Sequence, residues 1–526
     1  MRPFSQRSGA DAAHDRSFSR RRVHRRLPIP YPTFESIRKL WPVVNFPAVL
    51  RIIGLLLMIE GGFMLIPLGV CLLYQEPDFE GFAVAAGAAL GAGALMAFGI
   101  KPERSHMAKR EGFLLTALVW VFFSAFGMIP FMMMGRPLSV SDAFFEAMSG
   151  FTTTGASVMD SICRLSHGII IWRALMQWIG GMGIILFTLA VIPMLNRSGG
   201  IQMFNAEVTG ITHDKLRPRI SQTAKSLWAI YICLTLALFG LLVAGPMDIF
   251  TSVCYAFSTM STGGFSTSDA GDELWHSDYL MTIVTCFMFL GGVSFTLLYR
   301  LVHGEFRKVW ANDVFRYFVA FILVFYLLFL IPIYQSGAPL TVRAFLLEPL
   351  FQIISFISST GYTVPSFASW GAFVLALVFI LLFFGACAGS TSGGAKIDRL
   401  IFLLKNCRNE IVRSIYPNNI LTVRVNGRVI PHDVIAKVVA FLCLYVLIIA
   451  VGGIVLCALN VPLIDAFFSA FTCISNTGLQ TGITGYGQTF SIIPDAGKWV
   501  LALIMLIGRL ELFTVLILFS PSFWRK

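Results

Sequence analysis

Charged residues are scarce in this chain of 526 residues: only 13% are Asp, Glu, Lys or Arg, and 56% are hydrophobic. Soluble domains carry about 25% charged residues, so this composition excludes a soluble domain and predicts an integral membrane protein. The formal net charge of +12 could indicate a nucleic-acid partner. The basic residues flank apolar segments instead of forming a basic domain, so we expect a lipid bilayer and no nucleic acid as a partner.

Cysteine motifs and grouped catalytic residues are also missing. The ten cysteines lie mostly inside apolar segments, with no spacing typical of a disulfide framework or a zinc site, which indicates small buried hydrophobic residues. A membrane-embedded enzyme would need clustered His, Asp or Glu in its spans, and the apolar segments are nearly free of them. We therefore predict that the chain is not an enzyme and holds no cofactor.

The first 47 residues lack an apolar core and are polar, basic and rich in Arg, Ser and Pro. This excludes a secretory signal peptide and predicts a basic, disordered cytoplasmic tail. Its arginine runs, Arg20-Arg21-Arg22 and Arg25-Arg26, could meet anionic lipid headgroups. Alternatively, the tail is solvated and only fixes the orientation of the chain.

A short motif with a Thr-Gly pair is present four times. The copies are Thr153-Thr154-Gly155-Ala156, Ser261-Thr262-Gly263-Gly264, Ser359-Thr360-Gly361-Tyr362 and Asn476-Thr477-Gly478-Leu479. Their glycines are separated by 108, 98 and 117 residues. This spacing predicts an internal repeat of about one hundred residues.

Each copy follows a short apolar run that opens near a carboxylate. The acid stands thirteen residues before the glycine in three copies (Asp142, Glu348 and Asp465), and Asp248 stands fifteen before it in the second. Such a run is too short to cross a bilayer as a helix, and an acid at its start suits the positive end of a helix dipole. Long apolar segments lie on both sides. The predicted repeat is a long helix, a short re-entrant helix, a Thr-Gly loop and a second long helix.

Two more apolar spans, roughly 50–74 and 81–100, predict a helical hairpin before the repeats. Glu60 lies inside the first span, where it is either functional or paired with a neighbouring helix. The predicted fold is an all-α polytopic membrane protein with ten transmembrane helices, in which four pseudo-symmetric helix–pore loop–helix repeats surround one central pore beside the N-terminal hairpin. The predicted segments are the tail 1–47, the hairpin 48–111, the first repeat 112–196, a cytoplasmic loop with the second repeat 197–302, the third repeat 303–404, and a cytoplasmic loop with the fourth repeat 405–526.

The distribution of Lys and Arg predicts the orientation. With ten spans, both termini lie on one side, and the segments assigned to the cytoplasm hold 34 of the 40 basic residues, against five outside. The remaining one, Arg509, falls inside a span. This bias follows the positive-inside rule, so both termini are predicted to be cytoplasmic and the Thr-Gly loops to face outward.

Four outward loops of this kind suit the binding of an alkali cation. A dehydrated cation needs oxygen atoms in place of its water shell, and four segments around one axis can supply backbone carbonyls and hydroxyls. Glycine tolerates positive φ, which lets successive carbonyls turn toward the axis. The short helices would point their negative ends at the cavity below, which favours a cation there.

The fourfold unit, the extra hairpin and the glycines at 155, 263, 361 and 478 resemble the Trk-type potassium uptake subunits of bacteria, in the superfamily that includes Ktr and the plant HKT transporters. The stretch from Glu207 through Lys215 to Trp228 is also similar to this family. The resemblance covers about residues 48–520. It implies a homodimer in the bacterial inner membrane and a peripheral cytosolic regulatory subunit with nucleotide-binding domains, similar to TrkA. The basic loops at 197–225, 300–316 and 396–437 are the expected docking sites.

The resemblance also implies the residues that bind the transported ion. A serine in place of the first filter glycine is associated with sodium preference in plant relatives, so Gly155 favours potassium. Because the four copies differ in sequence, we expect looser selectivity than in a symmetric potassium channel. The implied potassium-binding filter residues are Thr153, Thr154, Gly155, Ser261, Thr262, Gly263, Ser359, Thr360, Gly361, Asn476, Thr477 and Gly478.

Two features are candidates for a gate. Arg509 is a charge well inside the last span, where an arginine normally faces a polar interior, and it matches an arginine that projects into the pore in this family. The alternative is a structural pair with Glu60 or another buried acid that only holds helices together. The second candidate is the segment Gly385–Lys396, which interrupts a predicted helix and matches an intramembrane loop that obstructs the pore in the family. Its candidate gate residues are Gly389, Ser390, Thr391, Ser392, Gly393 and Gly394.

Milder interruptions follow the other Thr-Gly loops, at Gly180-Gly181, Gly291-Gly292 and Gly508. Close helix packing explains these as well as motion does.

Three functions compete on the sequence. A secondary transporter would favour broken helices and often inverted repeats, whereas parallel repeats with loops entering only from outside favour a pore. A pore of the same superfamily could instead conduct sodium. The sequence leaves open whether transport is channel-like or a symport driven by protons or sodium.

Overall fold

The computed structural model describes residues 44–101, 109–183, 220–269, 277–335, 341–419, 421–479 and 489–524. In these ranges the chain is mostly helical, and its two strands, β1 (Arg424–Val425) and β2 (Arg428–Val429), form one small antiparallel hairpin. Predictions for the basic tail up to residue 43 and for most of the loop 197–225 lie outside the described residues.

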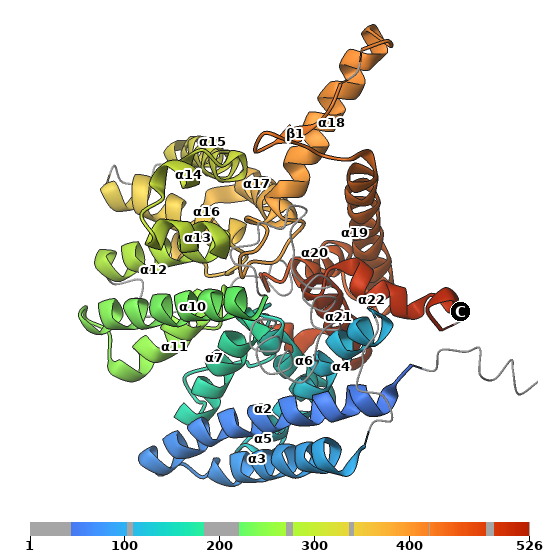
Figure 1. The fold of residues 1–526 in the computed structure, drawn as a ribbon. Coiled ribbons are helices and arrows are strands. Elements are labelled where there is room, and N and C mark those ends of the chain that lie inside the picture. The colour runs from blue at the N-terminus through green and yellow to red at the C-terminus, as the bar shows by residue number, and fades with distance from the viewer. Residues whose placement is uncertain are drawn as a thin grey trace, which may run out of the picture. The chain divides into compact units, whose positions relative to one another are not determined.

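The two N-terminal helices, α2 (Phe46–Tyr74) and α3 (Phe79–Ala94), pack along each other (Figure 1). The π-helical turn η1 (Leu95–Gly99) continues α3. Glycines bring the backbones together, because a Cβ on Gly54 would lie only 2.6 Å from the carbonyl oxygen of Gly93. Small residues at such crossings allow membrane helices to pack closely.

The sequence of a long helix, a short helix, a loop and a further helix then recurs four times. The first two units comprise α4 (Lys109–Gly127), α5 (Ile129–Met133), α6 (Val140–Phe151) and α7 (His167–Gly181), then α10 (Ile220–Val243), α11 (Ile249–Met260), α12 (Asp278–Gly292) and α13 (Phe295–Val302).

The third unit comprises α14 (Phe306–Trp310), α15 (Asp313–Gln335), η3 (Arg343–Leu347), α16 (Glu348–Ile357), η4 (Pro365–Trp370), α17 (Gly371–Phe384) and α18 (Ile397–Ile415). The fourth comprises α19 (His432–Ala458), α20 (Leu463–Ile474), η6 (Phe490–Ile492), α21 (Asp495–Arg509), α22 (Leu512–Phe519) and α23 (Pro521–Trp524).

Six helices in the described ranges are long and apolar enough to cross a membrane, and two bent pairs raise the number to eight. The bent pairs are α12 with α13, at 111°, and α21 with α22, at 120°. The other two predicted spans contain α7, described to residue 183, and α17, which ends at Phe384. The predicted number of ten therefore stays a prediction, because four of the ten predicted spans are not long continuous helices.

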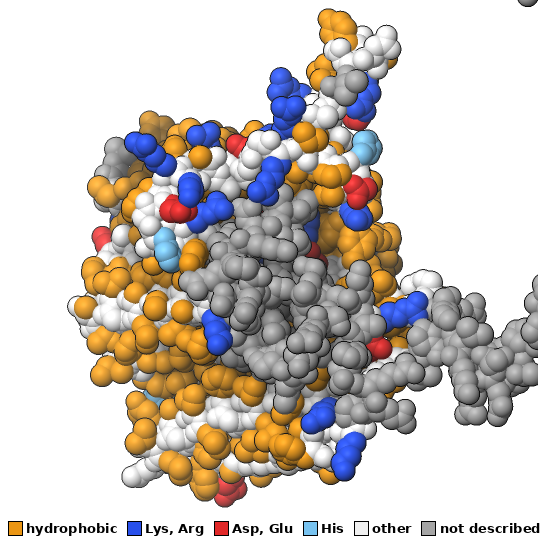
Figure 2. All heavy atoms as spheres, in the orientation of Figure 1, with side chains coloured by type: hydrophobic (Ala, Val, Ile, Leu, Met, Phe, Trp, Pro, Cys, Tyr) orange, Lys and Arg blue, Asp and Glu red, His pale blue; other side chains and the backbone are white. Residues whose placement is uncertain are grey.

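Side chains on the surface match a membrane setting. Apolar side chains cover most of the visible surface of α2, α3 and α10, whereas several Lys and Arg side chains gather near α14 and along α18 (Figure 2). The four short helices, α6, α11, α16 and α20, are mostly buried within the bundle. Their C-terminal ends position the candidate site.

Candidate ion-binding site

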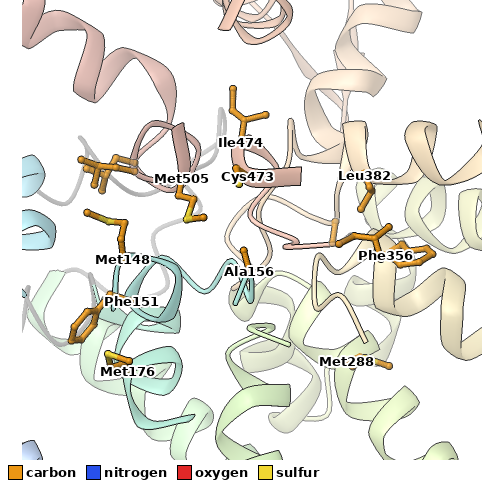
Figure 3. Close-up of a cluster of buried hydrophobic side chains, with 14 of the residues drawn as sticks. Met148, Phe151, Ala156, Met176, Met288, Phe356, Leu382, Cys473, Ile474 and Met505 are labelled. Atoms are coloured by element: carbon orange, nitrogen blue, oxygen red, sulfur yellow. The ribbon is translucent and has the colours of Figure 1, made fainter. Parts of the chain in front are cut away.

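The four Thr-Gly loops come together at the C-terminal ends of the short helices. Apolar side chains from all four units surround them, including Phe151, Met288, Phe356 and Ile474, with Ala156 of the first loop near the middle of the view (Figure 3). The Thr, Ser and Asn side chains of the loops are buried, and the glycines Gly155, Gly264, Gly361 and Gly478 are half-buried. The site is thus a polar centre inside an apolar wall.

All four loops have the same backbone conformation. Each contains a non-glycine residue in the left-handed region, with φ between 51° and 55°, followed two positions later by a glycine with φ between 64° and 85°. Left-handed conformations are uncommon for residues with a Cβ. The first residues are Thr153, Thr262, Ser359 and Asn476, and the glycines are Gly155, Gly264, Gly361 and Gly478.

The backbone hydrogen bonds repeat in the same way. In every loop the residue before that glycine donates its N–H to the carbonyl five positions earlier, at 2.9–3.0 Å. The pairs are Thr154 with Ser149, Gly263 with Ser258, Thr360 with Ser355, and Thr477 with Thr472. Four unlike sequences therefore adopt one hydrogen-bonded turn.

The loops pack against one another in a closed ring. A Cβ added to any of the four glycines would overlap the carbonyl oxygen of the residue before the next glycine, so no side chain fits there. The contacts run from Gly155 to Gly263, from Gly264 to Thr360, from Gly361 to Thr477, and from Gly478 back to Thr154. Both the positive φ and the close approach require glycine.

The second loop differs by one position from the sequence alignment. Its left-handed glycine is Gly264, whereas the alignment of the copies placed Gly263 in that role. The sequence did hold the necessary pattern, since Ser266 follows Gly264 by two residues as Ser157 follows Gly155. With this register, Asp248 and Ser139, the caps of α11 and α6, both stand sixteen residues before the glycine.

All four loops carry hydroxyl groups, and in three of them two neighbouring hydroxyls form a pair. Neighbouring hydroxyls lie 2.8 Å apart in Thr152 and Thr154 and in Ser358 and Thr360, and 3.2 Å apart in Ser475 and Thr477. The second loop lacks this pair because Gly263 occupies the second position. The ring is therefore built from neutral carbonyl and hydroxyl oxygens, ligands that suit a dehydrated monovalent cation.

No group of three or more His, Cys, Asp or Glu within the described ranges could hold a metal ion. The ring of neutral oxygens is thus the candidate site for a cation in this part of the chain.

The glycine interruptions mark places where later helices pass the ends of the short helices. A Cβ on Gly180 would overlap the carbonyl oxygen of Phe151, and one on Gly508 would overlap that of Ile474. Gly181 lies against Ser261 in the same way. Close packing accounts for these glycines without any movement.

We call residues Gly385–Lys396 the inner loop, and it contacts three of the Thr-Gly loops. The N–H of Gly393 donates to the hydroxyl of Ser359 at 2.5 Å, and the hydroxyl of Thr391 donates to the carbonyl of Met260 at 3.3 Å. A Cβ on Gly393 would overlap the carbonyl oxygen of Ser475. The ammonium of Lys396 donates to the carbonyl of Ser392, within the loop.

Arg509 joins the inner loop to the first repeat. Its guanidinium donates to the carbonyl of Thr391 at 2.8 Å and to the carbonyl of Gly180 at 2.7 Å. Glu60 is not its partner: both carboxyl oxygens of Glu60 are buried and make no hydrogen bond with any residue that the structure describes. The predicted pair of Arg509 with Glu60 is therefore wrong in this structure, whereas a pair with another buried acid stays a prediction.

Comparison with known proteins identifies relatives over most of the chain. A family model described as TrkH, cation transport protein, matches residues 83–526. The Trk system potassium uptake protein TrkH of Escherichia coli K12 is 36% identical over 490 residues, which is 92% of this chain and 100% of that protein. The TrkG protein of the same organism is 29% identical over 481 residues, which is 91% of this chain and 98% of that one. The crystal structure of the potassium transporter TrkH from Vibrio parahaemolyticus matches with a TM-score of 0.82 and 33% identity, covering 91% of this chain and all of that one.

Proposed function

Because the chain belongs to the TrkH family of cation transport proteins, we propose that it takes up potassium as the translocating subunit of a Trk-type system, with the ring of four loops as its selectivity filter. Its relatives include a potassium uptake protein and a potassium transporter. Potassium is the substrate here, and the proposal requires no cofactor in this chain.

One observation carries the filter assignment. The four loops contact each other in cyclic order through backbone atoms, and each places a carbonyl oxygen against the next glycine. A dehydrated cation requires such a cage of oxygens from several directions. The proposed filter comprises the twelve residues named from the sequence, with Gly264 added as the fourth left-handed glycine.

The inner loop and Arg509 are the proposed gate. The loop residues Gly389 to Gly394 lie against the Thr-Gly loops of the second, third and fourth repeats, and Arg509 holds the loop to the first. These contacts support a closed pore. Opening would require Arg509 to release the carbonyl of Thr391, which breaks a hydrogen bond with a charged donor.

The proposed setting is the inner membrane of a bacterium, with both termini in the cytoplasm, as a homodimer. A peripheral nucleotide-binding regulator would dock on the basic elements on that side. Helix α18 and the β1–β2 hairpin carry Lys405, Arg408, Arg413, Arg424 and Arg428. The exposed apolar residues Ile411 and Ile415 on α18 support a protein partner there.

A sodium-conducting or ion-coupled transporter is the second candidate. The observation that favours it is the uneven wall of the ring, because the second loop lacks the hydroxyl pair found in the other three. The missing hydroxyl at the position of Gly263 would weaken the discrimination between potassium and sodium at that wall.

Flux into proteoliposomes that hold the purified protein separates these functions. We expect passive rubidium or potassium uptake that sodium competes with poorly, and loss of this preference in Gly361→Ser. Uptake that requires a proton or sodium gradient would favour the coupled transporter. Absence of alkali-cation flux in both the native protein and Arg509→Ala would contradict the proposal.

A further inference from the structure

A buried ion pair lies behind the ring and has no part in the filter or the gate described above. The carboxylate of Glu146, on α6, is 2.8 Å from the guanidinium of Arg173, on α7, and their side chains are 0% and 1% exposed. Such a pair is costly to bury unless its remaining hydrogen-bonding groups are satisfied. The other contacts of Glu146 and Arg173 therefore show which segments of the chain the pair stabilises.

Glu146 binds the segment that leaves the first Thr-Gly loop. Its carboxylate accepts the N–H of Val158 at 2.9 Å and the hydroxyl of Ser157 at 3.1 Å. Ser157 is two residues past the ring glycine Gly155. The carboxylate thus fixes the backbone just where it turns away from the proposed filter.

Arg173 extends this support to the second repeat. Its guanidinium donates to the hydroxyl of Ser157 at 3.1 Å and to the carbonyl of Ser266 at 3.5 Å, and it lies 4.1 Å from the ring centroid of Phe265. Phe265 and Ser266 directly follow the ring glycine Gly264. One side chain therefore contacts the segments leaving two adjacent loops.

The position of Glu146 has equivalents in the other repeats. Nine residues before the ring glycine the chain has Glu146, Tyr255, Gln352 and Ser469. Gln352 accepts the N–H of Val364 at 2.9 Å, the same bond that Glu146 makes with Val158, and it donates to the carbonyl of Tyr362. The hydroxyl of Tyr255 lies 3.3 Å from that of Ser266.

A neutral amide is thus sufficient to hold a single loop, as the third repeat demonstrates. The charge in the first repeat serves an additional purpose, which is to keep Arg173 in the position that joins two repeats. At the offset of Arg173, eighteen residues after the ring glycine, the third repeat has Phe379.

We propose that Glu146 and Arg173 are a positioning pair that holds the first two filter loops at a common spacing and thereby sets the preference for potassium over sodium. This inference rests on the proposed function. Neither residue contacts the transported ion. The pair acts on the carbonyl positions of the ring through Ser157 and Ser266.

The test uses Glu146→Gln with Arg173→Met, separately and combined, in the full-length protein. Each single change leaves one buried partner uncompensated, so we expect poor folding. The double variant copies the neutral arrangement of the third repeat and is expected to fold. Its potassium-to-sodium flux ratio should fall by about fivefold or more, while total cation flux persists, since selectivity depends on the position of the filter oxygens.

A second variant and a matched control complete the test. Ser157→Ala keeps both charges, removes the hydroxyl they share, and should shift the ratio in the same direction by a smaller factor. The control, Asp142→Asn with Lys498→Met, removes another ion pair between repeats, at 2.5 Å. Asp142 lies in the first turn of α6, at the opposite end of this helix from the first Thr-Gly loop. It should leave the ratio unchanged.

A native ratio in both Ser157→Ala and the double variant would overturn the proposal, as would an equal shift in the control. If the double variant fails to fold, Ser157→Ala alone decides the proposal by the same criterion. Failure of the proposed function would be recognised separately, because the unaltered protein would then show no potassium-selective flux.

Discussion

The ring of Thr-Gly loops and the helix breaks beyond it are organised in opposite ways. In the ring, four unlike sequences share one backbone conformation and one hydrogen bond. Beyond it, the breaks differ: a bend of 111° in the second repeat, a loop of twelve residues in the third, and a bend of 120° in the fourth.

This difference separates positions where the backbone conformation restricts the sequence from positions where a particular side chain is required. The ring uses main-chain carbonyls, so side chains can vary as long as glycine remains at the contact points. The region beyond the ring depends on individual side chains, above all Arg509 and those of the inner loop. Each of these side chains comes from a single repeat. The backbone-built loops are repeated in all four units, whereas each proposed gate residue occurs in one unit.

The largest expected effect comes from breaking the ring. Gly155→Ala adds a Cβ at φ +79° that would overlap the carbonyl of Gly263, so we expect potassium flux to fall on the order of a hundredfold or the protein not to fold. Gly304→Ala is the matched control, because Gly304 has φ +77° and no atom within 4 Å of an added Cβ. Similar losses in both variants would attribute the effect to backbone strain and contradict the packed ring.

The next prediction tests whether Gly264 or Gly263 is the ring glycine of the second loop. Gly264→Ala places a Cβ at positive φ against the backbone carbonyl of Thr360, whereas the Cβ of Gly263→Ala would meet the far end of a side chain, that of Gln177. We expect Gly264→Ala to reduce potassium flux about tenfold more than Gly263→Ala. The reverse order in flux assays would restore the register expected from the sequence.

Removing the guanidinium of Arg509 is expected to increase potassium flux. Arg509→Ala removes the bonds to Thr391 and Gly180, and one hydrogen bond to a charged group contributes about 1.5–3 kcal/mol. Basal potassium flux without a regulator should rise at least about tenfold, with selectivity retained. Arg413→Ala, at an exposed pair on α18, is the control. Unchanged flux in Arg509→Ala would contradict the assignment of Arg509 to the gate.

The smallest effect concerns the caps of the short helices. The side chain of Asp248 accepts the N–H of Thr251 at 3.0 Å, so Asp248→Ala should lower stability by about 1 kcal/mol and leave the ion preference intact. Thermal unfolding in detergent and flux ratios measure the two quantities. A changed ion preference would mean that helix position, and not the ring backbone, controls selectivity.

Sequence alone was sufficient for the family and for the loops, since the Thr-Gly copies and the short apolar runs are local patterns. Membership of the Trk-type family, expected from those residues, is confirmed by the match over residues 83–526. The register of Gly264 was missed because the copies were aligned on their Thr-Gly pairs, although the matching positions of Ser157 and Ser266 held the signal. The sequence did not predict that Arg173 lies buried behind the ring in an ion pair with Glu146, because such a pair depends on how two helices pack. Glu146 and Arg173 are 27 residues apart in the sequence.

The central claim is that the four loops bind one dehydrated cation, and the most direct measurement is an experimental density map of the protein in rubidium or thallium. The account predicts strong density on the axis of the ring, enclosed by the carbonyls of Thr154, Gly263, Thr360 and Thr477. A well-ordered ring without such density, or ion density elsewhere in the protein only, would contradict it.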